Sequence, residues 1–447
     1  MEKTFKRGRN FMMTLSRQNL ANGFTYLALF LLPWQTRWIF ARLNLGGEPW
    51  EYGVLSLYAV EILIFCAVLL RGRFHWPLKM HSLIFPGGIF FGLSFIFSFF
   101  SLVPILSFVT LFHTFFAFLL FLLLLDERLS FFTSLTYFFC GLLVPVCLGW
   151  FQVLTGTSPA STFFGLAEHM ATTLGVSVIE TSAGRLMRAY GSFSHPNIFG
   201  GFLAVAVFFA SIFPIVFQKK KTIWFVLAAF LSSTTLIVTF SRSAWVAIVV
   251  SLILFFLFVW FERKESKRFH RSFGVMSFVL IGGCIALFGF RDAVMTRFNS
   301  TVRLEVKSVS DRVFEYGDFQ TLYSSLHPMQ WFYGIGSGTY TVALEQLNPG
   351  YSVWNYQPIH NTVFLFLIEN GWILFLIATV WLGMYLNYFF KYRVQGGIIG
   401  IIFCVLYGTI ALFDHYLWSS WSGMVLIAVS VGFSLRFVQE KEKENSG

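Results

Sequence analysis

The chain has 447 residues, of which 56% are hydrophobic, 20% aromatic and only 12% charged. A soluble domain carries roughly 25% charged residues, so this composition argues against a soluble globular protein. The net charge of +11 resides mostly in short segments between apolar runs. We therefore expect contacts with anionic membrane lipids and no nucleic acid partner.

Apolar runs long enough to cross a membrane recur along the whole sequence. Such a helix needs about 17–25 residues, and we predict about twelve of them on that criterion. The expected fold is all-α, a polytopic membrane protein in which residues 1–447 form one integral membrane domain. The predicted spans are residues 22–40, 50–70, 82–100, 102–125, 130–152, 196–217, 222–240, 243–261, 272–290, 361–390, 396–413 and 418–437.

The distribution of lysine and arginine predicts the orientation, because cytoplasmic loops carry an excess of both. Most of the 32 basic residues fall in the N-terminal segment, in alternate hairpins and in the C-terminal tail. This pattern predicts that both termini are cytoplasmic. The basic residues on the outer side are arginines except for Lys307. Arginine presents a planar fork that binds phosphate, although it also caps helices and extends toward lipid headgroups.

Two predicted outer segments are long, residues 151–195 and residues 291–360. Loops of this length are usually functional. The first is rich in Thr, Ser and Gly and can enter the headgroup region. The second begins with a predicted surface helix over residues 303–327 and breaks at the glycine-rich stretch 334–338. We expect this larger loop, between helices nine and ten, to carry part of the active site.

Three predicted helices begin on the outer side with residues suited to chemistry. They open with His195-Pro196-Asn197, with Ser241-Arg242-Ser243 and with His360-Asn361. Helix N-termini attract anions, so three such ends beside arginines predict a pyrophosphate site. Arg242 lies in a very short hairpin, where a charge at the bilayer edge is costly unless it has a partner; the alternative is an arginine that extends to lipid phosphate.

His360 is the candidate general base, because imidazole titrates near neutral pH. The alternative is a histidine that only caps its helix. We expect nearby Arg242 and Arg312 to lower its pKa. Glu369 lies about half a turn out of phase with His360 on a helix; it is therefore not a simple relay partner, and a structural bond to another helix is equally compatible.

No metal site is expected from the acidic residues of the outer side. Asp311, Glu315 and Asp318 are clustered, but their spacing is typical of a solvated helix face. Hard cations need several oxygen ligands at one point, and no Asp-x-Asp pair provides them.

Together these motifs resemble the O-antigen ligase and polymerase superfamily of bacterial membrane glycosyltransferases. The resemblance covers about residues 185–385. The order of the motifs and their common placement on one face of the membrane make it specific. The matching pieces are residues 191–197, residues 241–244, Asp311-Arg312 ahead of residues 334–338, and His360-Asn361 with Glu369-Asn370-Gly371.

The resemblance implies a metal-independent, inverting transferase of the bacterial cytoplasmic membrane that needs no cofactor. It would take a glycan from undecaprenyl diphosphate on the periplasmic face. Arg242 and Arg312 would hold the diphosphate, and His360 would deprotonate or orient the acceptor hydroxyl. The supporting residues would be Arg188, Asn197, Asn361 and Glu369.

The resemblance leaves the acceptor open. In the superfamily it is lipid A core for ligases, a growing lipid-linked glycan for polymerases, or a protein. We favour the ligase of lipopolysaccharide biosynthesis, with the polymerase second. A secondary transporter or lipid flippase is the alternative from another class; it would place ionisable groups near the bilayer midplane, where Glu61 is the clearest candidate.

Overall fold

The computed structural model describes residues 17–216, 222–261, 266–299, 301–393 and 396–446. Within these ranges the fold is mostly helical, as predicted. The long helices are α2 (Arg17–Leu31), α3 (Ala59–Arg71), α4 (Leu78–Ser98), α5 (Pro104–Leu125), α6 (Phe131–Thr155), α7 (Pro196–Val216), α8 (Thr222–Val238), α9 (Arg242–Phe261), α10 (Ser266–Gly289), α15 (Thr362–Lys391), α16 (Gly397–Phe413) and α18 (Trp421–Ser446).

Six of these helices are long and apolar enough to cross a membrane, counting only the described residues. They are α4, α5, α6, α10, α15 and α18, while α7, α8, α9 and α16 contain shorter apolar stretches. The chain is therefore an integral membrane protein. The count of about twelve spans stays a prediction from run length.

The first two predicted spans are wrong over part of their length. Residues expected at the end of one helix and at the start of the next form an antiparallel hairpin of β1 (Arg37–Leu45) and β2 (Glu48–Tyr58). The turn consists of Gly46 and Gly47, whose φ angles of 56° and 87° are left-handed. A Gly-Gly pair between two β-prone stretches favours a tight two-residue hairpin, so the apolar strands pair with each other instead of extending the helices.

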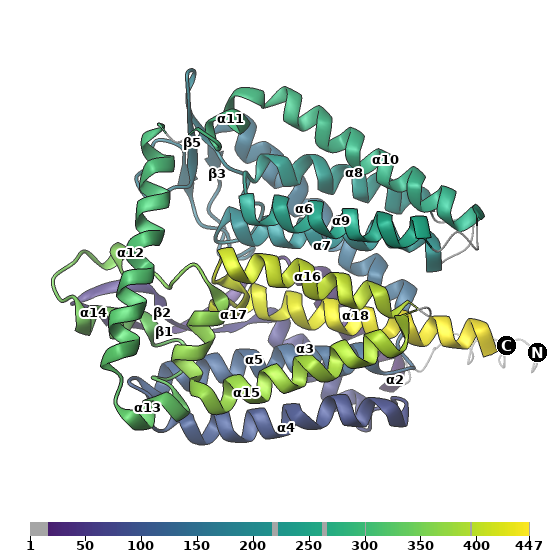
Figure 1. The fold of residues 1–447 in the computed structure, drawn as a ribbon, viewed down its shortest axis with the longest axis horizontal. Helices are drawn as coiled ribbons and strands as arrows, with labels where there is room; N and C mark the ends of the chain where they lie inside the picture. The colour runs from purple at the N-terminus through teal and green to yellow at the C-terminus, as the bar shows by residue number, and fades with distance from the viewer. Residues whose placement is uncertain (1–16, 217–221, 262–265, 300, 394–395, 447) are drawn as a thin grey trace, which may run out of the picture.

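The polar elements collect at one end of the helix bundle (Figure 1). There α12 runs across the ends of the long helices, whereas α18 ends at the opposite end of the bundle. The predicted surface helix over residues 303–327 is confirmed as α12. The shorter elements are β3 (Thr157–Ser158), β4 (His169–Met170), β5 (Val178–Thr181), β6 (Gly184–Met187), α11 (Arg291–Thr296), α12 (Arg303–Ser325), α13 (Pro328–Tyr333), α14 (Tyr340–Leu347), the 3₁₀ turn η1 (Val353–Asn355) and α17 (Tyr416–Ser419).

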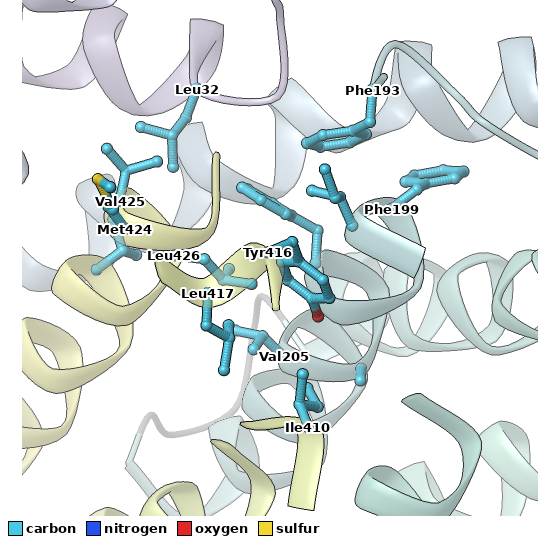
Figure 2. Close-up of a cluster of buried hydrophobic side chains, with 14 of the residues drawn as sticks. Leu32, Phe193, Phe199, Val205, Ile410, Tyr416, Leu417, Met424, Val425 and Leu426 are labelled. Carbon is cyan, nitrogen blue, oxygen red and sulfur yellow. The ribbon is translucent and has the colours of Figure 1, made fainter. Parts of the chain in front are cut away.

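The short helix α17 is anchored in the apolar core beside α7 and α18. Figure 2 shows Tyr416 among Phe199 and Val205 of α7 and Leu426 of α18. The approach is close, since a Cβ atom on Gly201 would lie 2.0 Å from the Tyr416 hydroxyl oxygen. This anchoring fixes the segment that precedes α17, which carries acidic and histidine side chains to the polar end.

Helix α15 is kinked where the motif Glu369-Asn370-Gly371 occurs. Gly371 has φ 68° inside the helix, and the glycine-rich stretch 334–338 packs into the break. The N–H of Ile335 donates to the carbonyl of Ile368 at 3.0 Å, and the N–H of Gly336 to that of Glu369 at 2.9 Å. The stretch thus satisfies carbonyl groups that the kink leaves without helical partners.

Replacing Gly371 by alanine is expected to destabilise this kink. Its positive φ alone costs a non-glycine residue about 1–3 kcal/mol, and the added Cβ would lie 2.4 Å from the Gly334 nitrogen. We expect Gly371→Ala to lower the thermal unfolding temperature of the purified protein in detergent. Gly383→Ala in the same helix is the control, because nothing lies within 4 Å of its Cβ position. Equal unfolding temperatures for the two variants would contradict the role of the kink.

Candidate active site

His360 and Glu315 form a close pair at the start of α15. The carboxylate oxygens of Glu315 lie 2.9 and 2.8 Å from His360 Nδ1, and one of them accepts the backbone N–H of His360 at 2.9 Å. Glu315 is therefore not part of a solvated helix face, as its spacing had indicated, because α12 turns it toward α15. The carboxylate favours a proton on Nδ1, and His360 Nε2 has no hydrogen-bond partner in the described part of the chain.

The pKa of His360 is raised above its usual 6.5, contrary to the direction expected from the sequence. Burial of the ring lowers this pKa, but the hydrogen bond and negative charge of Glu315, together with the charge of Asp414, outweigh burial. Arg312 does lower the pKa of His360, as expected, but its effect is smaller than that of Glu315. The sequence-based expectation was wrong because it omitted the carboxylate partner.

Glu315→Gln is expected to shift the pH dependence of activity. A general base must be unprotonated, so activity should fall as the pH drops through the pKa of His360. Removing the negative charge of Glu315 lowers that pKa, and the acidic limb should move to lower pH. Rates measured across pH in membrane vesicles test this, with Asp318→Asn on the same helix as the control. An unmoved limb in Glu315→Gln would show that Glu315 does not act through His360.

Asn361 caps α15, which corrects the idea that His360 is the capping residue. The Asn361 side-chain oxygen accepts the N–H groups of Val363 at 3.0 Å and Phe364 at 3.1 Å, and its amide donates to the Tyr316 hydroxyl at 3.3 Å. The N–H of Thr362 donates to the carbonyl of Asp414 at 3.0 Å. The first-turn donors of α15 are therefore already used.

The N-terminus of α7 is occupied in the same way. His195 accepts the N–H of Asn197 at Nδ1 and that of Ile198 at its carbonyl, both at 3.1 Å. The prediction that these two helix ends form an anion site was wrong, because local side chains and the preceding loop satisfy their N–H groups. Binding of a diphosphate would depend on the arginines instead.

Asn197 joins Arg188 to a buried aspartate. Arg188 donates to the Asn197 side-chain oxygen at 2.6 Å, and the Asn197 amide donates to Asp414 Oδ2 at 2.7 Å. Arg188 also donates to the carbonyl of Thr239 at 2.7 Å. Burial, and next the charge of Arg297, lower the pKa of Arg188 to about 9, so it stays charged at neutral pH. Two N–H donors of Arg188 are therefore already used in hydrogen bonds within the protein.

Sequence reasoning missed Asp414. Its side chain is buried, and burial raises its pKa although His360, Asn197 and Arg312 act in the opposite direction. The signal that could have found it is an aspartate between two predicted spans, 396–413 and 418–437, on the outer side. An ionisable residue in so short a connection is expensive unless it has partners.

Arg242 is paired with a buried carboxylate. Its Nη1 lies 3.2 Å from Glu305 Oε2, and Arg297 forms an ion pair with the other oxygen of the same carboxylate. Glu305 is only 4% exposed. Arg242 is thus held by the protein, which is the partnered case expected for a charge at a bilayer edge. Neither Glu305 nor its pairing was predicted.

Arg312 differs from these two arginines. It is partly exposed, and none of the hydrogen bonds or ion pairs among the described residues involves its guanidinium group. Its charge nevertheless acts on both His360 and Asp414. Arg312 is therefore a cation near the candidate base that is available to a ligand.

A polar cavity of about 630 Å³ extends from His360 into the bundle. Asn197, Glu369 and Asp414 line it, but Arg188, Arg242 and Arg312 do not. Within the described ranges, no group of three or more His, Cys, Asp or Glu residues is placed to hold a metal ion.

Three further histidines, His113, His195 and His415, line the cavity with His360. His195 Nε2 lies 3.2 Å from Ser177 Oγ, and His415 Nδ1 lies 2.7 Å from Ser419 Oγ. Burial, and next the charge of Arg188 for His195 and of His360 for His415, hold both pKa values well below 6.5. His195 and His415 are therefore neutral hydrogen-bonding groups, whereas His360 contacts the carboxylate of Glu315 and His113 that of Glu61.

Glu369 lies in the cavity wall but makes structural contacts. Its carboxylate accepts the N–H groups of Gly338 at 2.9 Å and Tyr340 at 3.1 Å, and the indole N–H of Trp418 at 2.7 Å. It thereby caps the start of α14 and holds the glycine-rich stretch against the kink. These contacts fit the structural alternative for Glu369 that the sequence left open.

A family model described as O-antigen ligase matches residues 227–379. No curated protein matches the chain. The matched region contains Arg242, Arg312 and His360, whereas Arg188, Asn197 and Asp414 lie outside it. The resemblance stated from the motifs is thus confirmed: the chain carries the domain of the O-antigen ligase superfamily over residues 227–379.

Proposed function

We propose that the chain transfers a glycan from undecaprenyl diphosphate to an acceptor hydroxyl on the outer face of the cytoplasmic membrane. The observation that carries this proposal is the His360–Glu315 pair, which faces a polar cavity. The pair and the nearby Arg242, Arg297 and Arg312 all lie within the family-matched region. Most lysines and arginines fall in the segments predicted to be cytoplasmic, which supports an outer placement of the His360 site.

In the proposed step His360 is the base and its Nε2 takes the proton of the acceptor hydroxyl. The acceptor oxygen forms a bond to the anomeric carbon of the donor sugar with inversion. The bond from that carbon to the diphosphate oxygen breaks, and its electron pair leaves with undecaprenyl diphosphate. Glu315 stabilises the imidazolium that forms, as a carboxylate does in other acid–histidine pairs.

The arginine cluster supplies the charge that the leaving group needs. Arg242 and Arg297 pair with one buried carboxylate, Glu305, whose charge also acts on Arg188. Arg312 adds a further positive charge without an ion pair in the described residues, so positive charge is in excess. The diphosphate gains negative charge as the glycosidic bond breaks. Fixed cations close to developing charge lower the barrier because they need no reorganisation.

Arg242→Lys is expected to lose most transfer activity. Lysine keeps the charge and can still pair with Glu305, but it loses the planar fork that binds a diphosphate through two hydrogen bonds. Transfer is measured in membrane vesicles at matched expression, with Arg303→Lys as the control, since the Arg303 side chain is 76% exposed. Wild-type activity in Arg242→Lys would leave Arg242 as a partner of Glu305 only.

A ligase acting on lipid A core is the first choice of acceptor reaction, and a polymerase is the second. The glycan profile of a deletion strain distinguishes them. Loss of all long glycan on the lipid A core indicates a ligase, whereas capping by a single repeat unit indicates a polymerase. An unchanged surface glycan would contradict both.

A transporter or flippase is the competing class, and one observation favours it. Glu61 is fully buried, and its carboxylate lies 2.5 Å from His113 Nδ1 in α5, so a protonatable pair lies inside the bundle. Ion-coupled flux in proteoliposomes without any glycan transfer would support that class.

A further inference from the structure

One wall of the cavity is aromatic. Tyr52, Val54 and Tyr58 of β2 all line the cavity, as residues two or four apart on one face of a strand can. Tyr58 stacks on Trp421 of α18, with ring centroids 5.4 Å apart at 22°. His113 packs edge-on against Tyr58 at 5.5 Å. We call Tyr52, Tyr58, His113 and Trp421 the aromatic wall.

The aromatic wall is bordered by polar groups that lack partners. Trp421 is 3% exposed and Gln35 is 9% exposed, and both line the cavity. Trp421 Nε1 and Gln35 Nε2 are buried donors without any hydrogen-bond partner within the described residues. A buried donor left without a partner costs about 1–3 kcal/mol, so a ligand with acceptor oxygens at this point would remove that cost.

Two polar side chains, Glu61 and Arg37, hold the wall in position. Glu61 accepts the backbone N–H of Tyr58 at 2.7 Å and contacts His113 Nδ1, so both wall residues are fixed by one carboxylate. Arg37 donates to the Tyr58 hydroxyl at 3.2 Å and lines the cavity as well. His113 Nε2 has no hydrogen-bond partner among the described residues and is therefore also available.

The position of the wall identifies which substrate it can contact. His360 and His415 rings lie 5.0 Å apart, and the His415 and Tyr52 rings lie 6.3 Å apart, so a row of rings leads from the candidate base to β2. The arginines expected to hold the donor diphosphate do not line the cavity. The aromatic wall therefore faces the cavity, whereas the arginines expected to hold the donor lie outside its lining.

We propose that the aromatic wall binds the acceptor glycan, a step that rests on the proposed function. A sugar ring has an apolar C–H face and an edge of hydroxyl groups. The face fits the stacked Tyr58 and Trp421 rings, and the hydroxyls match the free donors of Trp421 and Gln35. His113 and Arg37 supply further hydrogen bonds at the edge. The acceptor hydroxyl then points toward His360.

Binding of two probes to the purified full-length protein in detergent tests this inference. One probe is the mixture of oligosaccharides released by mild acid from the surface glycan of the strain that carries the chain; the other is undecaprenyl diphosphate. Trp421→Phe keeps a six-membered aromatic ring at this position and removes the N–H together with the five-membered part of the indole. We expect it to weaken oligosaccharide binding by roughly 3–10-fold, the effect of one neutral hydrogen bond, and to leave undecaprenyl diphosphate binding unchanged.

The controls separate this inference from the proposed function. Trp224→Phe, at a side chain 71% exposed on α8, should bind both probes like the wild type. His113→Gln should also weaken oligosaccharide binding alone. Wild-type oligosaccharide affinity in both Trp421→Phe and His113→Gln, or no oligosaccharide binding by the wild type, overturns the inference. Absence of undecaprenyl diphosphate binding by the wild type overturns the proposed function instead.

Discussion

His360→Gln is expected to reduce glycan transfer by about 10²–10⁴-fold, the usual loss when a general base is removed. Glutamine can still form hydrogen bonds near Glu315, and Asn361 still caps α15, so the local fold should persist. Glutamine cannot accept a proton at neutral pH. Initial rates of transfer in membrane vesicles, at matched protein levels, measure the effect, while binding of undecaprenyl diphosphate should remain.

The control for this variant is His81→Gln. His81 is an exposed residue of α4 that packs against Trp76 and does not line the cavity. The His81→Gln variant should transfer glycan at the wild-type rate. Near-normal transfer by His360→Gln would mean that His360 only orients the acceptor, and the base would be another group.

Arg312→Ala is expected to reduce kcat by about 10²–10³-fold, as the loss of one group that stabilises developing negative charge does. Its removal breaks no ion pair in the described residues, so the stability of the fold should not change. This separates Arg312 from Arg242, whose removal would leave Glu305 buried with one partner fewer. Kinetic measurement of kcat together with thermal stability in detergent tests both expectations.

Arg303→Ala is the matched control for Arg312→Ala. Both residues belong to α12, but they lie about half a turn apart around the helix, and Arg303 pairs with Glu180 instead. Arg303 is therefore poorly placed to substitute for Arg312. Unchanged kcat in Arg312→Ala would exclude Arg312 from stabilising the leaving group.

The helical nature of the chain could be predicted because apolar run length is a strong signal. The β1–β2 hairpin was missed for a physical reason. Its strands have 9 and 11 residues and are rich in aromatic and aliphatic side chains. Composition does not tell an apolar run in a strand from an apolar run in a helix. The Gly46-Gly47 pair was the remaining signal for the turn.

The sequence pointed to individual residues of the candidate site but not to the contacts between them. His360 and Arg242 stand next to helix starts, and Arg312 lies within the predicted surface helix, so all three could be found in the sequence. The partners Glu315 and Glu305 could not, because their roles depend on how α12 crosses the bundle. That arrangement is tertiary, and it reverses the pKa direction expected for His360.

The predicted anion site at the helix starts failed for a related reason. The sequence shows that N–H groups exist at a helix start, but it does not show whether neighbouring residues already use them. In α15 they are taken by Asn361 and the carbonyl of Asp414, and in α7 by His195.

Proteoliposomes that contain the purified chain and a lipid-linked glycan donor provide the most direct test of the proposed transfer. The measurement follows released undecaprenyl diphosphate and newly formed glycosidic bonds together. We expect one undecaprenyl diphosphate to be released for each glycan transferred, and expect both signals to disappear in His360→Gln. Movement of the intact donor across the bilayer, without any new glycosidic bond, would contradict the proposed function.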